Sequence, residues 1–234
     1  MNIATLNIDW GRKYKSAQHY LKIEQWLDAL DVDFLVLTEA ISLDLRNFPY
    51  QFHCAAIPAN AEYEGLNYSE YLHGETAYRT MIYSKYPAVQ TLETRDARTS
   101  IAVEFETKEG NFVLYATIIG TRYPPFPHAA PPLENCTLDC EKIYQQHKNL
   151  MIVGDLNTSF LEHEREYTIN AKTTEELKRL FARLDLINVT EYLTTNIDHI
   201  IVPQSFSHHT PDSTVFVEKG VLSDHQGVMV CITT

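Results

Sequence analysis

Short apolar runs separated by polar segments recur along the whole chain, and they predict a protein rich in β-strands. The predicted strands are residues 2–8, 33–40, 50–57, 77–84, 100–106, 111–119, 150–153, 197–202 and a closing strand within 222–230. Residues 100–106 and 111–119 flank a turn at Lys108, Glu109 and Gly110, which indicates a hairpin. Because several strands follow one another without helices, a mixed or antiparallel sheet is favoured over a simple parallel one.

Apolar residues at helical spacing predict amphipathic helices between some of these strands. One helix runs from about residue 17 to 30, with an apolar face of Tyr20, Ile23, Leu27 and Leu30. Another begins at Thr173, which fits a capping box with Glu176, and its apolar face is Leu177, Leu180, Phe181 and Leu184. A weaker helix is predicted at 134–147. A helix between the first two strands indicates a layered α/β protein. No linker or repeat interrupts the sequence, so residues 1–234 are predicted to form a single domain.

Polar side chains lie at the ends of five of the predicted strands. In IVGDLNTSF (152–160), Asp155 and Asn157 come after a buried strand, and on an extended segment both leave the same face. Gly154 allows the chain to turn and its backbone to pass close to a ligand. The other strand ends carry Asn7, Glu39, Asp198, and Asp224 with His225. Each alone is also typical of turns, but their coincidence favours one shared site.

The net charge of −12 disfavours binding of long polyanions through a broad basic face. It suits acidic residues that hold a divalent cation, and it favours a small molecule or a short nucleic acid as substrate. The sequence shows no signal peptide and no apolar stretch long enough to span a membrane. Its four cysteines form no CxxC pair and no Cys/His zinc pattern, which is typical of reduced thiols. We therefore expect a cytoplasmic protein, and no protein partner is evident.

Two long loops are candidates for substrate contacts. Residues 58–75 are polar and rich in tyrosine, and a loop of this length predicts a lid or a substrate-selecting insert. Residues 120–132, GTRYPPFPHAAPP, contain five prolines, which make the segment stiff and extended. This loop is either a structural arm or, through Arg122 and Tyr123, a rim of the cleft that contacts substrate.

The oxygen-rich set of strand-end residues suits Mg²⁺, or Mn²⁺, better than zinc. Its order and spacing resemble the endonuclease/exonuclease/phosphatase superfamily of metal-dependent phosphodiesterases and phosphatases. GDLN (154–157) and SDH (223–225) carry the resemblance most specifically, and TEA (38–40), IDH (197–199) and MIYSKYP (81–87) occur in the expected order. The match extends from Asn7 to Val230.

This resemblance implies a DNase I-like α/β (α+β) fold: a four-layer sandwich of two packed mixed β-sheets flanked by helices. It implies that Glu39 holds the metal with help from Asn7 and Asp224. Asp155 would orient or deprotonate the attacking water, and Asn157 would donate to the phosphate. His225 would contact or protonate a phosphate oxygen while Asp198 orients it. These roles describe a Mg²⁺-dependent hydrolase of a phosphoester substrate, with phosphodiesters favoured over monoesters.

Two positions depart from the family pattern. Ile118 stands where members of the family usually place a histidine or tyrosine that contacts phosphate, and Arg79 stands where a small residue is frequent. Two alternatives therefore stay open beside the phosphodiesterase: a DNA or RNA endo- or exonuclease of the same fold, and a noncatalytic binding module with a degenerate site.

Overall fold

A computed structural model describes residues 1–10, 17–57, 76–120, 130–164, 171–206 and 212–232, together with four two-residue strands. One sheet contains β1 (Asn2–Asn7), β2 (Phe34–Ile41), β3 (Tyr50–His53), β6 (Ala77–Ser84), β15 (Asp212–Val217) and β16 (Gly227–Cys231). The other contains β7 (Ala88–Leu92), β8 (Ser100–Thr107), β9 (Gly110–Ile118), β12 (Leu150–Asp155), β13 (Leu186–Asn188) and β14 (Asp198–Pro203).

The remaining elements connect or cover the sheets. The α-helices are α1 (Ala17–Asp28), α2 (Ala130–Gln146) and α3 (Ala171–Arg183), and the short 3₁₀ helices are η2 (Glu162–Glu164) and η3 (Gln204–Phe206). The two-residue strands are β4 (Glu62–Tyr63), β5 (Leu66–Asn67), β10 (Arg122–Tyr123) and β11 (Phe126–Pro127). None of the helices in the described ranges is both long and apolar enough to cross a membrane.

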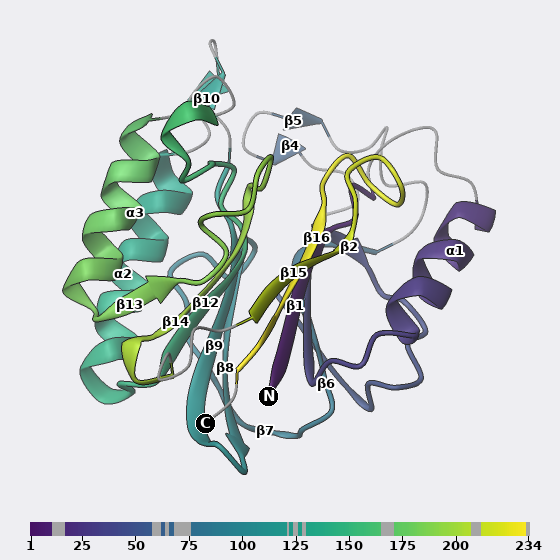
Figure 1. The fold of residues 1–234 in the computed structure, drawn as a ribbon, viewed down its shortest axis with the longest axis horizontal. Helices are drawn as coiled ribbons and strands as arrows, with labels where there is room; N and C mark the ends of the chain where they lie inside the picture. Colours follow the sequence, from purple (N-terminus) through teal and green to yellow (C-terminus); the bar gives the residue numbers. More distant parts are fainter. Residues whose placement is uncertain are drawn as a thin grey trace.

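The two sheets pack face to face, with α1 on one outer surface and α2 and α3 on the other (Figure 1). Their strand orders are β15-β16-β1-β2-β6-β3 and β13-β14-β12-β9-β8-β7. The pairs β1–β2 and β9–β12 are parallel, while the other neighbours in both sheets are antiparallel. The predicted four-layer sandwich of two mixed sheets is therefore confirmed.

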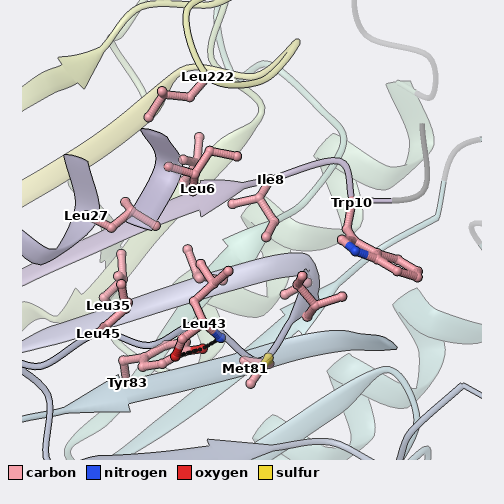
Figure 2. Packing of buried hydrophobic residues seen from close by; sticks show 14 of the residues in the cluster. Leu6, Ile8, Trp10, Leu27, Leu35, Leu43, Leu45, Met81, Tyr83 and Leu222 are labelled. Carbon is pink, nitrogen blue, oxygen red and sulfur yellow. Dashed lines mark hydrogen bonds between the residues drawn. The ribbon is translucent and has the colours of Figure 1, made fainter. Parts of the chain in front are cut away.

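Three apolar clusters hold these layers together because each sheet buries side chains on both of its faces. The inner cluster joins the sheets and includes Phe34, Ile82, Leu114 and Val153. The second lies between α1 and its sheet, where Leu27 packs with Leu6 and Leu35 (Figure 2). In that cluster the buried hydroxyl of Tyr83 accepts a hydrogen bond of 2.7 Å from the backbone N–H of Leu43. The third lies beneath α2 and α3.

The apolar patterns located most elements well, and the differences have physical causes. The strand at 77–84, the hairpin and the apolar face of α3 are confirmed. The capping box is wrong, because α3 begins at Ala171 and Thr173 is buried inside the helix. The patterns also missed β7, β13 and β15, which are edge strands. An edge strand that is short or exposed on one face has no continuous apolar run to reveal it.

Candidate active site

The site begins where β12 passes close to β9. The strand continues through Gly154 to Asp155, so the predicted turn at Gly154 is wrong. Gly154 is nevertheless required, because its φ of +138° is rarely adopted by other residues. A Cβ atom at this position would lie 2.0 Å from the carbonyl oxygen of Thr117 on β9. The glycine thus lets two parallel strands approach and delivers Asp155 to the end of the sheet.

Asp155 is fully buried and is held by two asparagines. One carboxylate oxygen accepts a 2.8 Å hydrogen bond from the backbone N–H of Asn157. The other accepts from the Asn157 side-chain amide and from that of Asn7 at the end of β1, both at 3.0 Å. Asn157 adopts a φ of +50°, so the segment is not extended and the predicted same-face geometry is wrong. The left-handed turn instead directs both Asn157 donors back to Asp155.

Asp198, which is buried, and His225, which is partly buried, form a pair beside Asp155. Asp198 begins β14 opposite Asp155 in the sheet register, and His225 lies in the segment before β16. The Nδ1 atom of His225 lies 2.6 Å from Oδ2 of Asp198. The other oxygen of Asp198, Oδ1, is buried without a hydrogen-bond partner among the described residues. One ligand atom from each of Asp155, Asp198 and His225 lies within 4.8 Å of the others.

The folded protein raises the pKa values of both Asp155 and His225. Burial, together with the negative charges of Asp198 and Glu39, raises the pKa of Asp155 to about 7, although His225 and Asn7 oppose the shift. Burial alone would lower the pKa of His225, but the charges of Asp198 and Asp155 and the hydrogen bond to Asp198 outweigh it and raise this pKa to about 10. At neutral pH His225 is therefore an imidazolium, while the raised pKa brings the titration of Asp155 close to neutral pH.

His199 is a buried residue of the site region whose role the sequence did not indicate. Its Nε2 lies 2.9 Å from the carbonyl oxygen of Thr158, and its Nδ1 lies 3.1 Å from both Asn188 and Thr190. Burial lowers the pKa of His199 to about 4, so the ring is neutral at physiological pH. It joins β13 and β14 to the segment after Asn157. The feature of the sequence that could have pointed to His199 is its position directly after Asp198.

The other predicted site residues lie around this centre. Glu39, near the end of β2, has a φ of +45° and is partly exposed, and its charge acts on Asp155. Asp224 is also partly exposed, and its charge acts on His225. Neither belongs to the tight group of Asp155, Asp198 and His225, and the metal-ligand set of Asn7, Glu39 and Asp224 stays a prediction.

The predicted substrate-contacting loops are described only in part. Arg122 and Tyr123 form β10, but their side chains lie outside the described residues. The insert at 58–75 also lies outside them, apart from β4, β5 and the pairing between these two strands. In Figure 1, β4, β5 and β10 lie at the end of the sandwich opposite the amino end of β1.

Comparison with known proteins identifies the class. A model of the endonuclease/exonuclease/phosphatase family matches residues 4–225, and the chain belongs to this family. No curated protein matches the sequence. The fold is similar to that of a 3′ phosphatase from Neisseria bound to a product DNA hairpin, with a TM-score of 0.68, 16% identity and all of both chains covered.

Two further solved structures illustrate the breadth of the fold. The human Nocturnin catalytic domain has a TM-score of 0.65 and 17% identity, with 100% of this chain and 93% of that chain covered. Sphingomyelinase C from Streptomyces griseocarneus has a TM-score of 0.65 and 14% identity, with 100% and 99% covered. At these identities the likeness shows the fold alone. The family consists of hydrolytic enzymes that act on phosphoesters, and its members generally depend on a divalent metal.

Proposed function

We propose that this protein is a divalent-metal-dependent phosphoester hydrolase that cleaves phosphodiesters in preference to phosphomonoesters. The observation that carries the proposal is the convergence of Asp155, Asp198 and His225, whose ligand atoms lie within 4.8 Å of one another. Structural ion pairs also perturb pKa values, but a buried carboxylate beside a partly buried imidazolium is typical of catalytic groups. We also propose that residues 1–234 act as one domain in the cytoplasm, and the core shared by both sheets supports the single domain.

The residues suit a hard cation. The donors around the site are carboxylate and amide oxygens, which Mg²⁺ and Mn²⁺ prefer, and Asp198 Oδ1 is a buried acceptor with no partner in the described ranges. Asn7, Glu39 and Asp224 would hold the ion at the rim of the tight group. When bound, Mg²⁺ would neutralise the phosphate and stabilise the charge that develops in the transition state.

The chain's own residues then have distinct tasks. Asp155, with a pKa of about 7, accepts the proton of the attacking water, since general bases work best when their pKa is near the working pH. The side-chain amides of Asn7 and Asn157 fix the orientation of its carboxylate. His225, kept protonated because Asp198 and Asp155 raise its pKa to about 10, donates from Nε2 to a phosphate oxygen. Asp198 fixes the imidazolium through Nδ1.

Ile118 bears on the choice of substrate. It ends β9 opposite Asp155 in the register and is 1% exposed, so its apolar side chain offers the phosphate no donor. Arg122 and Tyr123 are the proposed replacements. The second candidate is a nuclease of the same fold, which the neighbour bound to a DNA hairpin favours. A noncatalytic binding module is the remaining alternative, and Ile118 is the feature that supports it.

The test is hydrolysis of bis(p-nitrophenyl) phosphate, p-nitrophenyl phosphate and an abasic DNA duplex, with Mg²⁺ or Mn²⁺ against a chelator. Asp155→Asn removes the base without changing side-chain shape. Asp139→Asn is the matched control, because Asp139 is a buried carboxylate on α2 outside the site. Metal-dependent turnover that Asp155→Asn removes and Asp139→Asn keeps would support the proposal. Metal binding without turnover on any substrate would favour the binding module, and turnover that is insensitive to chelator would refute metal dependence.

A further inference from the structure

Glu164 is a buried carboxylate with no place in the proposed chemistry. It ends η2, nine residues after Asp155 in the chain, and is 6% exposed. One of its oxygens accepts a 2.8 Å hydrogen bond from the Ser159 hydroxyl, and the other accepts a 2.7 Å hydrogen bond from the backbone N–H of Thr195. A buried charge is tolerated only where such partners stabilise it. Glu164 therefore ties the chain after Asp155 to the segment that precedes β14.

The Thr195 segment needs such support because its backbone is strained. Thr195 has a φ of +55°, which is unusual for a β-branched residue and persists only where the surroundings impose it. The Thr195 N–H donates this hydrogen bond to the Glu164 carboxylate, and a hydrogen bond to a carboxylate is stronger than one between neutral groups. The Thr195 hydroxyl in turn donates to Oε1 of Gln226 at 3.2 Å, and Nε2 of Gln226 donates to the carbonyl of Thr194 at 3.2 Å.

Segment 194–196 thereby contacts Asp198 itself and Gln226, the residue that follows His225. On one side, the Asn196 side chain donates to the carbonyl of Asp198 at 2.6 Å and accepts from its N–H at 3.3 Å. On the other side, Gln226 directly follows His225 in the chain. Asp198 and His225 are 27 residues apart and lie on different elements, so their 2.6 Å hydrogen bond depends on how these elements are held together.

We propose that Glu164 is a positioning residue that holds Asp198 and His225 in register through segment 194–196. This inference rests on the proposed function for its catalytic consequence, but the geometry that it describes does not depend on turnover. Asn196 fixes the Asp198 backbone, Gln226 fixes the segment that carries His225, and Glu164 anchors the strained residue between them. Loss of Glu164 releases Thr195 and lets the two halves of the pair separate.

The direct test is proton NMR of the His225 Nδ1–H, because a ring proton in a short hydrogen bond to a carboxylate resonates far downfield of amide protons. His225→Ala assigns the resonance. Glu164→Ala is expected to shift or broaden it. Glu164→Gln is expected to keep it, since the amide oxygen still accepts from Thr195 and the NH₂ group can donate to Ser159.

Asp139→Ala is the matched control. Asp139 is 2% exposed and accepts from the Arg95 N–H and the Tyr115 hydroxyl, each at 3.1 Å. It thus resembles Glu164 in burial and bonding, but it has no hydrogen bond to segment 194–196 in the described part of the chain. Thr195→Val, at an exposed position, removes the hydroxyl link to Gln226 without leaving a buried charge unmet, and it replaces Glu164→Ala if that variant does not fold.

Turnover supplies a second readout through a double-mutant cycle. Glu164→Ala is expected to lower kcat by about 10- to 100-fold, the loss typical of a displaced catalytic group. In a His225→Ala background the same change is expected to lower kcat less than about twofold, because the pair is already broken. Asp139→Ala should leave kcat per folded molecule unchanged.

The outcomes separate the two proposals. An unshifted resonance in folded Glu164→Ala, or in Thr195→Val where Glu164→Ala fails to fold, would overturn the positioning role. Equal losses of kcat in Glu164→Ala and Asp139→Ala would overturn it too, as would a wild-type protein without the downfield resonance. A wild-type protein that shows the resonance and its loss in Glu164→Ala, but hydrolyses no phosphoester, would uphold the positioning and refute the proposed function.

Discussion

Gly154→Ala should destabilise the protein much more than an ordinary glycine-to-alanine change. An added Cβ would lie 2.0 Å from the Thr117 carbonyl oxygen, whereas such contacts do not fall below 3.0 Å. The β9 and β12 backbones would therefore have to separate by about an ångström, which weakens the hydrogen bonds between them. The φ of +138° adds conformational strain. The structure provides a matched control at Gly110, which has a φ of +109° but no atom within 4 Å of an added Cβ.

The two glycines separate strain from steric clash. Gly110→Ala should lower the free energy of unfolding by about 1–2 kcal/mol, since only backbone strain is introduced. Gly154→Ala should lower it by about 3–5 kcal/mol, because separation of the strands adds about one or two lost hydrogen bonds and their packing. Urea unfolding followed by circular dichroism measures both. If the two losses agree within about 1 kcal/mol, the close approach of β9 and β12 is not the reason for glycine at 154.

Three further results are expected. Asp155→Asn should reduce kcat per folded molecule by about 10²–10⁴-fold, and retention of more than a tenth of wild-type kcat would exclude Asp155 as the base. In the presence of chelator, the free energy of unfolding should fall as the pH rises from 7 to 10. Asp198 and Asp155 raise the pKa of His225 to about 10 in the folded protein, whereas the unfolded value is about 6.5. Between these values the folded protein binds a proton that the unfolded chain does not, and this stabilisation is lost as the pH approaches 10. His225→Gln should flatten that slope, and an unchanged slope would contradict the ion pair. Finally, Mn²⁺ should raise the thermal midpoint of the wild type but not of Glu39→Gln, and equal shifts in both would remove Glu39 from the metal site.

Much of the fold could be predicted from the sequence because its elements have strong local signals. Buried strands such as 77–84 are apolar runs bounded by polar residues, and the face of α3 repeats at helical spacing. The motifs GDLN and SDH are contiguous, so they carried the family resemblance directly. The edge strands β7, β13 and β15 lack such signals, because an exposed or three-residue strand is specified by its neighbour rather than by its own pattern.

Tertiary structure alone decided how the site residues meet. Asn7 and Asp155 are 148 residues apart, and only the packing of β1 against β12 places the amide 3.0 Å from the carboxylate. Likewise, no sequence pattern could show that Glu164 accepts a hydrogen bond from Thr195, or that His199 is a buried, neutral imidazole. The proton affinities of Asp155, His199 and His225 follow from desolvation and from charges on other elements, and these exist only once the chain is folded. The sequence thus determined which groups are present, and the packed sheets determined what they can do.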